Sequence, residues 1–400
     1  MAAMQLSEQM QWIGRGAERL YTPPELERKL GSGRTLRIKL GLDPTAPDIH
    51  LGHTVVLRKM RQFQDLGHKA VLIIGDYTAR VGDPSGRDAT RPVLDEQAIE
   101  ANARTYLDQA GKILDTSDAR FELRRNSEWL SGLGFADVLR LTGQFTVQQM
   151  LHRDNFKKRM AEDREIQLSE FMYPLMQAYD SVVVEADVEL GATDQTFNNL
   201  RGRDLMGKRG LDPQVVVVMP ILVGLDGHEK MSKSKGNYVG VTDEPNDMFG
   251  KLMSIPDGLM GNYFELLTDL PEPRIRSLLD PGLTHPREAK DALARVVVEA
   301  YHDAEAANAA SDEFRSRFTQ GNLPTDLKTV AVAGGESPLA ALIAGVGFAA
   351  SNSEARRLIQ QGGVSFDGEK ITDPKARVSV PTEPVLLQVG KRRVCQVKSE

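Results

Sequence analysis

The 400-residue sequence lacks the features that mark membrane, secreted and disulfide-bonded proteins. It has a single cysteine, Cys395, and therefore can form neither an internal disulfide nor a cysteine-clustered metal site. No apolar run approaches the roughly 20 residues that a membrane helix needs. The first ten residues lack the basic-then-apolar pattern of a secretory signal. These absences exclude a membrane-spanning protein and predict a cytoplasmic location.

The composition, 40% hydrophobic and 26% charged, is typical of a globular protein with two or three domains. The net charge of −6 does not by itself indicate a nucleic-acid partner. Residues 337–400, however, hold nine Lys or Arg against six Asp or Glu, which leaves −9 on the rest of the chain. A basic tail on an acidic body indicates an anionic partner such as a phosphate backbone, although so small an excess also arises by chance.

Short apolar runs alternate with amphipathic stretches in the first two thirds of the chain. Leu36–Leu42 shows the period-two pattern of a strand, and Ala70–Ile74 and Val215–Met219 are continuous runs typical of doubly buried strands. Between the first two, Thr54–Leu66 has one apolar helical face, and Gly67 follows as a C-terminal cap. This order predicts an α/β fold with a Rossmann-like parallel sheet, in which ligands bind beyond the carboxyl ends of the strands.

Composition divides the chain further. We expect a catalytic domain over residues 1–242 and a helical domain over 243–321, in which Pro286–Asn308 forms a helix. Residues 322–336 have few bulky side chains and fit a linker. Residues 337–400 then form a small α+β domain.

Two motifs follow predicted strands. His50 and His53 flank Gly52 at a helix N-terminus, where two imidazoles can donate hydrogen bonds to a polyphosphate; ordinary capping histidines are the alternative. Far downstream, Lys230-Met231-Ser232-Lys233-Ser234 forms a cationic loop suited to a departing pyrophosphate, although a solvated basic loop is the alternative.

A third group of polar residues predicts a pocket. We expect a helix to begin at Met172 or Tyr173 with Pro174 in its first turn, so that Tyr173, Gln177 and Asp180 share a face. Asp180 could accept a hydrogen bond from a phenolic hydroxyl, while Tyr173 and Gln177 could bind an α-amino group. A polar outer face is the alternative. Asp83, in a turn after the second strand, and Asp194 and Gln195 can enter the same crevice.

The two strand-end motifs together resemble those of the class I aminoacyl-tRNA synthetases. In that family the paired motifs bind ATP and stabilise the transition state of adenylate formation. The resemblance implies ATP contacts, including the catalytic ones, at Gly41, Asp43, Thr45, His50, Gly52, His53, Lys230, Met231, Lys233 and Ser234.

The pocket residues are similar to those of the tyrosyl-tRNA synthetases. The resemblance runs over nearly the whole chain and implies tyrosine contacts at Asp43, Thr78, Asp83, Tyr173, Gln177, Asp180 and Gln195. Many bacterial members have a tyrosine two residues before Gly41, where this chain has Lys39, a variant that fits a second bacterial subtype. The alternatives are a tryptophan-specific relative and a non-catalytic RNA-binding paralogue.

The tail supports an RNA partner. Ser351–Val364 resembles the RNA-binding module of ribosomal small-subunit protein four, in which Ser353 would cap a short helix. The residues expected to meet RNA are Arg356, Arg357, Lys391, Arg392 and Arg393.

We therefore expect L-tyrosine, Mg-ATP and tRNA(Tyr) as substrates, with no metal or prosthetic group held by the protein itself. The resemblance also implies a homodimer, for which Leu141–Met160 is the candidate interface.

Overall fold

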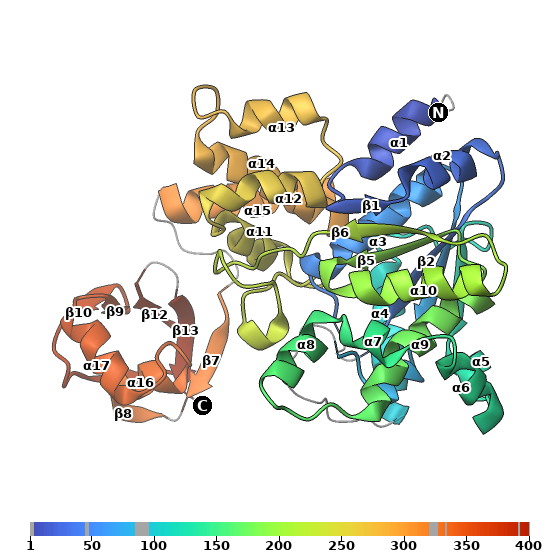
Figure 1. Ribbon diagram of the computed structural model, residues 1–400. Coiled ribbons are helices and arrows are strands. Elements are labelled where there is room, and N and C mark those ends of the chain that lie inside the picture. The colour runs from blue at the N-terminus through green and yellow to red at the C-terminus, as the bar shows by residue number, and fades with distance from the viewer. Residues whose placement is uncertain are drawn as a thin grey trace. The chain divides into compact units, whose positions relative to one another are not determined.

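The computed structural model of the chain describes residues 4–44, 48–84, 96–319, 327–332, 334–390 and 393–399. The chain forms two compact units, Met1–Ala307 and Asn308–Glu400. Each unit has its own sheet (Figure 1). The predicted site residues outside the described ranges are Thr45, Lys391 and Arg392.

A six-stranded sheet forms the centre of the large unit, in the order β1-β6-β5-β2-β3-β4. Five strands run parallel and β1 is antiparallel to β6. The predicted strands are present, and Val215–Met219 is buried at every residue because both faces of the sheet are covered. The strands are β1 (Arg19–Tyr21), β2 (Arg37–Leu42), β3 (Lys69–Ile74), β4 (Phe121–Arg125), β5 (Val188–Ala192) and β6 (Val215–Met219).

Helices cover both faces of this sheet. After β2, helix α3 (Leu51–Asp65) leads to β3, and α4 (Glu96–Ala110) leads from β3 to β4. The connection from β2 to β3 and on to β4 moves toward one edge of the sheet, whereas the connection from β5 through α10 (Thr196–Lys208) to β6 moves toward the other edge. Because both crossovers are right-handed, α10 lies on the face opposite α3. Helix α9 (Leu168–Val183) packs against α10 (Figure 1).

Helix α9 begins earlier than the sequence predicts. It starts at Leu168, after an N-cap at Gln167 whose N–H donates to Glu170, and Pro174 therefore lies inside the helix. The prediction of a start at Met172 or Tyr173 was wrong. Proline prefers the first turn of a helix, but this preference does not exclude it from the interior, where Pro174 lies. The shared face of Tyr173, Gln177 and Asp180 does not depend on the start.

Five further helices follow the sheet. Residues 286–308 do not form one helix as predicted, because the backbone breaks at His302 and Asp303 between α14 and α15. The five are α11 (Pro245–Met253), α12 (Met260–Leu267), α13 (Glu272–Leu279), α14 (Pro286–Tyr301) and α15 (Ala304–Thr319). The large unit also contains the helices α1 (Leu6–Gly14), α2 (Pro23–Gly31), α5 (Ser127–Leu130), α6 (Phe135–Thr142), α7 (Val147–Leu151) and α8 (Asp154–Ala161).

The small unit packs two helices, α16 (Leu339–Gly345) and α17 (Asn352–Gln360), against strands around an apolar core that includes Leu339, Ile343 and Leu387. One sheet has the order β10-β9-β12-β13-β7 and a second pairs β11 with β8. The strands are β7 (Thr329–Val332), β8 (Gly335–Pro338), β9 (Val364–Phe366), β10 (Glu369–Ile371), β11 (Arg377–Val380), β12 (Val385–Val389) and β13 (Arg393–Ser399).

The predicted linker at 322–336 contains strand structure, since β7 pairs in parallel with β13 and β8 begins at Gly335. The division of the chain at 242/243 and 321/322 stays a prediction. Among the residues that the structure describes, no helix combines the length and the apolar character needed to cross a membrane.

Helices α9 and α10 approach closely at Gly202. A Cβ added there would lie 2.5 Å from Gln214 Nε2 and 2.8 Å from Ser181 Oγ. We expect Gly202→Ala to lower the free energy of unfolding by about 1–3 kcal/mol, because buried polar groups would have to move. The measurement is urea unfolding followed by circular dichroism.

Gly250→Ala is the matched control, since a Cβ on this glycine of α11 would meet nothing within 4 Å. There the better helix propensity of alanine should raise the stability by up to about 1 kcal/mol. Equal effects of the two substitutions would contradict the packing argument.

Candidate active site

The two predicted histidines lie at the N-terminus of α3. His50 is the N-cap, and its Nδ1 accepts a hydrogen bond from Gly52 N at 3.2 Å. His53 Nδ1 accepts one from His50 N at 3.3 Å, and the ring centroids are 3.9 Å apart. Because each Nδ1 accepts a backbone N–H, the neutral rings carry their proton on Nε2, where it can be donated to a ligand. The capping alternative and the functional prediction are thus compatible.

Both imidazoles are neutral at pH 7. Burial, followed by the neighbouring His53, Lys233 and Lys230, lowers the pKa of His50 to about 3. Burial, followed by the same two lysines, lowers the pKa of His53 to about 4. The histidines therefore act as hydrogen-bond donors and not as cations.

The loop Lys230–Ser234, called the lysine loop below, lies beside these histidines, as the sequence predicted. Leu51 N donates to Val239 O at 2.9 Å, and Val241 N donates to Ile49 O at 3.1 Å. This pairing joins the segment after the loop directly to the segment before α3. A Cβ on Gly52 would lie 3.6 Å from Met231 Cβ, so the two motifs are in contact.

Within the loop each lysine faces a carboxylate. Lys233 pairs with Asp48, and Lys230 Nζ lies 3.9 Å from Asp194. Met231 is buried, and its N–H donates to Leu222 O at 2.8 Å. Ser234 contacts Ser232 through their hydroxyls at 2.8 Å. Buried Asn237 fixes the base of the loop through Ser232 N at 2.9 Å, a role that the sequence did not predict.

The polar pocket lies at the carboxyl ends of β2 and β3. Asp43 accepts hydrogen bonds from Tyr173 Oη at 2.9 Å and from Thr78 Oγ1 at 2.8 Å. The approach requires Gly75, where a Cβ would lie 2.0 Å from Asp43 Oδ1. Burial and the neighbouring Asp43 raise the pKa of Tyr173 well above its ordinary value, so its hydroxyl keeps its proton.

Asp180 is buried, with an exposed fraction of 3%. Trp129 Nε1 donates to its Oδ1 at 2.8 Å, and Asn126 Nδ2 lies 3.4 Å from its Oδ2. Burial raises the pKa of Asp180 to about 7, against the charge of Lys39 and the two hydrogen bonds. The Asp180 side chain therefore does not face bulk water, which the alternative of a polar outer face required.

Asn126 and Trp129 are pocket residues that the sequence analysis missed. They follow β4, an edge strand whose charged residues Glu122, Arg124 and Arg125 hide its strand character. Had β4 been recognised, the rule that ligands lie beyond the carboxyl ends of parallel strands would have identified both.

The remaining predicted pocket residues lie around Asp83. Gln195 Nε2 donates to Asp83 Oδ2 at 2.6 Å, and Arg153 Nη2 donates to Asp83 Oδ1 at 3.1 Å. Gln177 Nε2 instead donates to Glu189 Oε1 at 3.1 Å and to Asn199 Oδ1 at 2.9 Å. Arg153, just before α8, is another residue that the sequence did not predict. Gly41, the last residue but one of β2, is exposed.

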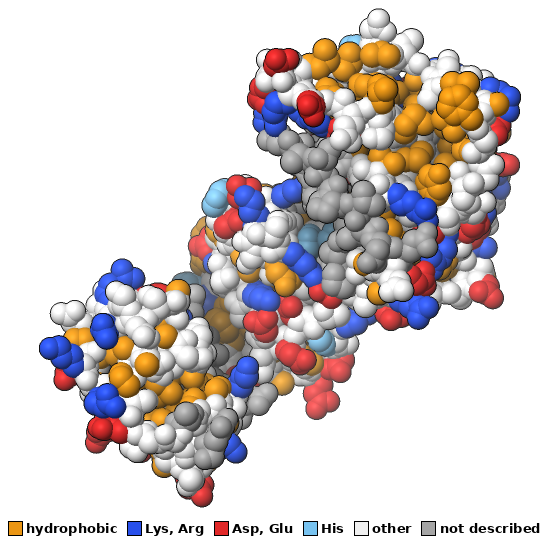
Figure 2. Space-filling view, turned by 90° about the horizontal axis from the view of Figure 1, so that it is seen from below, with side chains coloured by type: hydrophobic (Ala, Val, Ile, Leu, Met, Phe, Trp, Pro, Cys, Tyr) orange, Lys and Arg blue, Asp and Glu red, His pale blue; other side chains and the backbone are white. Residues whose placement is uncertain are grey.

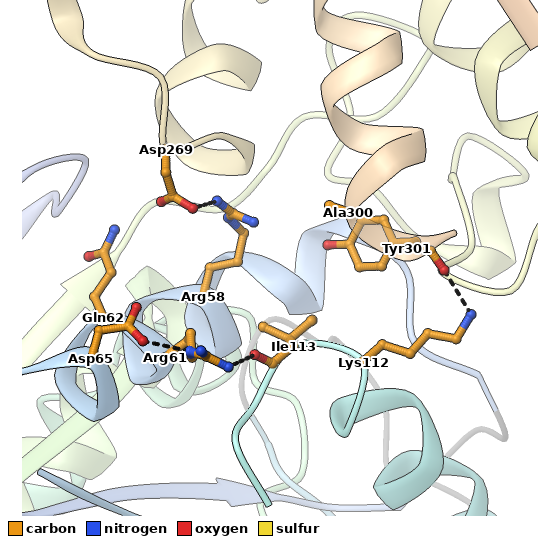
Figure 3. A pocket seen from close by; sticks show the side chains of 9 residues that line it. All are labelled: Arg58, Arg61, Gln62, Asp65, Lys112, Ile113, Asp269, Ala300 and Tyr301. Carbon is orange, nitrogen blue, oxygen red and sulfur yellow. Dashed lines mark hydrogen bonds and ion pairs between the residues drawn. The ribbon is translucent and has the colours of Figure 1, made fainter. Parts of the chain in front are cut away.

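A cavity of about 230 Å³ lies away from these residues, between α3, α14 and the segment after α4 (Figure 3). Arg58 pairs with Asp269 there, and Arg61 pairs with Asp65. None of the predicted site residues lines it. Among the described residues, no group of three His, Cys, Asp or Glu side chains is arranged to hold a metal ion.

Comparison with known proteins decides the family. Residues 32–319 match the family model of class I tRNA synthetases (W and Y), and residues 337–383 match the S4 domain. The chain is 50% identical over 400 residues to the tyrosine–tRNA ligase of Moorella thermoacetica, covering 98% of this chain and 96% of the relative. It is also 50% identical over 388 residues to that of Shewanella oneidensis, covering 96% and 97%. The chain belongs to the tyrosyl-tRNA synthetases.

Solved structures agree on the fold. A truncated mitochondrial tyrosyl-tRNA synthetase of Aspergillus nidulans has a TM-score of 0.65 at 25% identity, covering 78% of this chain and 94% of that one. The tyrosyl-tRNA synthetase of Archaeoglobus fulgidus, solved with L-tyrosine, has a TM-score of 0.61 at 24% identity, covering 77% and 100%. The predicted fold class is confirmed, while the bacterial subtype stays a prediction.

At the RNA end, Arg356 and Arg357 are exposed on α17, as an RNA-binding role requires. Arg393 is exposed and donates to Phe348 O. The predicted cap was wrong, because Ser351 accepts from Glu354 N at 3.3 Å and Ser353 lies inside the helix. Either serine has a suitable hydroxyl, and the extended backbone at Ser351 decides which one caps.

Proposed function

We propose that this chain, a tyrosine–tRNA ligase, forms tyrosyl-adenylate in the cleft between the histidines and the lysine loop and then transfers tyrosine to the 3′-terminal adenosine of tRNA(Tyr). The ligase activity follows from family membership. The observation that carries the assignment of the site is the buried Asp180 carboxylate. Its partner Asn126 also donates a hydrogen bond to Thr78 at 3.0 Å, and Thr78 in turn donates to Asp43.

The tyrosine end selects a phenol. Asp180 accepts a hydrogen bond from the substrate hydroxyl, and Thr78 orients Asp43. Asp83, Tyr173, Gln177 and Gln195 bind the amino-acid end, where Asp83 attracts the ammonium group. A substrate lacking the hydroxyl would leave a buried acceptor without its partner, which costs free energy.

The ATP end needs no covalent nucleophile. The tyrosine carboxylate attacks the α-phosphorus of ATP, a P–O bond forms, and the bond to pyrophosphate breaks. Positioning and charge neutralisation suffice for such a transfer. We assign the phosphates to Thr45, His50 and His53, the adenosine side to Gly41, Asp43, Gly52 and Met231, and the leaving pyrophosphate to Lys230, Lys233 and Ser234. Mg²⁺ arrives with ATP as part of the substrate.

The RNA end lies in the small unit. We assign phosphate contacts of the tRNA to Arg356, Arg357, Lys391, Arg392 and Arg393. The exposed guanidinium groups on α17 support this assignment.

A homodimer and a cytoplasmic location are further parts of the proposal. Large apolar side chains are exposed on α6 to α9, including Phe135 at 79% and Leu168 at 82%. Figure 2 shows apolar side chains gathered on the underside of the large unit, the side on which α6 to α8 lie in Figure 1. Exposed patches of this kind mark interfaces, and this one overlaps the predicted segment Leu141–Met160.

The single cysteine supports the proposed cytoplasmic location.

The first test is Asp180→Asn in ATP–pyrophosphate exchange with tyrosine, phenylalanine and tryptophan. We expect kcat/KM for tyrosine to fall roughly 30- to 1000-fold, because a charged acceptor of the substrate hydroxyl is lost. This fall corresponds to about 2–4 kcal/mol of transition-state stabilisation. The value for phenylalanine should hardly change, so discrimination collapses. The control is Asp204→Asn, which alters a carboxylate on the neighbouring helix α10 that pairs with Arg201. The assignment would be overturned if Asp180→Asn discriminated between tyrosine and phenylalanine as well as the unaltered chain does. It would also be overturned if the unaltered chain supported exchange with tryptophan as fast as with tyrosine.

The second test separates two lysines of one loop. Lys233→Ala should slow adenylate formation by about 10²–10³-fold, because the charge that stabilises the departing pyrophosphate is lost, while tyrosine binding changes little. Lys235→Ala is the matched control, since its ammonium group is half-exposed and lies 3.7 Å from Glu229. Pre-steady-state fluorescence measures both quantities. A large loss of tyrosine affinity in Lys233→Ala would contradict its role.

The third test concerns the tail. The double substitution Arg356→Ala/Arg357→Ala should spare exchange but raise KM for tRNA, and should lower the slope of log KM against log salt by up to about 1.4–1.8, since two phosphate contacts are lost. Gln360→Ala on the same helix should do neither. Unchanged charging kinetics in the double variant would refute an RNA role for α17.

A further inference from the structure

Lys39 is a fully buried lysine in the middle of the parallel sheet, with an exposed fraction of 0%. Its ammonium group donates to Ser181 Oγ at 2.7 Å, to Glu189 Oε1 at 2.7 Å and to the Gln177 carbonyl at 3.0 Å. An ammonium group has three N–H donors, and three acceptors meet it. The site thus fixes the side chain in one position.

The fold itself creates this site. Lys39 of β2 and Glu189 of β5 are direct partners in neighbouring parallel strands, so their side chains emerge side by side on the face that α9 covers. Glu189 is also buried and accepts from Gln214 Nε2 and, at 3.3 Å, from Ser181 Oγ. Gly202 of α10 lets these groups pack closely, since a Cβ there would lie 3.1 Å from Glu189 Oε2.

The ion pair contacts the turn of α9 that faces the substrate pocket. Lys39 holds the backbone of Gln177, and Glu189 holds the Gln177 side chain at 3.1 Å. Asp180 lies between the two α9 residues that Lys39 contacts, Gln177 and Ser181. A shift of this turn would therefore move two of the proposed tyrosine contacts together.

We propose that Lys39 is a positioning residue for the tyrosine pocket, acting through Gln177 and Glu189 to hold the substrate-facing turn of α9 and through its charge to favour the carboxylate form of Asp180. The inference deepens the proposed function and rests on its assignment of Asp180 and Gln177.

The charge of Lys39 opposes the effect of burial on Asp180. The charged and titratable groups that act on Asp180 are Lys39 from β2, Glu189 from β5 and Tyr173 from α9, and the uncharged Asn126 and Trp129 donate to it from the end of β4. Burial raises the pKa of Asp180 to about 7, and Lys39 is the foremost of the groups that lower it. Without Lys39 this pKa should rise further.

The test is Lys39→Met, which keeps the length of the side chain and removes its charge. Because the carboxylate form accepts the substrate hydroxyl, KM for tyrosine in the unaltered chain should fall as the pH rises through about 7. In Lys39→Met this fall should move to higher pH. At pH 7 the ratio of the variant's KM to the wild-type KM should be about fivefold for the first unit of pKa increase, because half of the wild-type Asp180 is already ionised, and about tenfold for each further unit. The ratio should shrink by pH 9, while KM for ATP changes little.

Two more variants keep the test decisive. Lys39→Met alone leaves Glu189 buried and unpaired, which can prevent folding, so the second variant, Lys39→Met/Glu189→Gln, removes both charges. Because Glu189 raises the pKa of Asp180 and Lys39 lowers it more strongly, the double variant should show a pH-dependent ratio in the same direction but smaller. Lys29→Met is the matched control, because Lys29 is another fully buried, ion-paired lysine whose partners Asp187 and Asp212 lie outside the pocket. It should lower the melting temperature without changing the pH profile.

A ratio that does not vary with pH, or that matches Lys29→Met, would overturn the proposal and leave Lys39 a purely structural residue. Asp180→Asn in the same assay separates the two levels of the argument. If it abolishes discrimination while Lys39→Met has no pH effect, only this inference fails. If it leaves discrimination intact, the proposed function fails with it.

Discussion

The backbone pairing of Ile49 and Leu51 with Val239 and Val241 is the interaction on which the site depends. It joins two motifs that lie far apart in the sequence, and it does so through main-chain groups, so the side chains remain available for ligands. The same proximity places Lys230 and Lys233 where their charges disfavour protonation of His50 and His53. The cations of the loop thus lie beside neutral, oriented donors, an arrangement that suits the polyphosphate of the proposed function.

A second constraint acts at the carboxyl ends of the strands, where Thr78 and Asp180 are buried. Each acidic group there must have partners, because an unpaired buried charge is costly. Asp43 has Thr78 and Tyr173, Asp180 has Asn126 and Trp129, and Asp83 has Arg153 and Gln195. These partners fix the carboxylates before a substrate arrives. The pocket is therefore preorganised, which lowers the ordering cost of binding.

The sequence predicted the strands and helices that follow simple periodicity, and it predicted that the histidine and lysine motifs lie together. It failed where a tertiary neighbour overrides a local pattern. The charged strand β4 is stable because β3 pairs with it, and without β4 neither Asn126 nor Trp129 could be recognised. Pro174 indicates a helix start, yet Gln167 and Glu170 start α9 earlier. Lys39 alternates with apolar residues as a surface lysine would, and only the parallel register with Glu189 reveals its partner.

Stability alone does not account for the Lys39 cluster, because replacing a buried ion pair by apolar groups is often neutral or stabilising. Comparison with Lys59 sharpens this point. Lys59 is equally buried, but it meets the carbonyls of Ile13 and Arg15 near the end of α1, and burial lowers its pKa to about 7. Carbonyls suffice to anchor a helix end. Lys39 instead forms an ion pair with Glu189, and this pair beside α9 orients the Gln177 amide and biases Asp180, which an apolar core could not do.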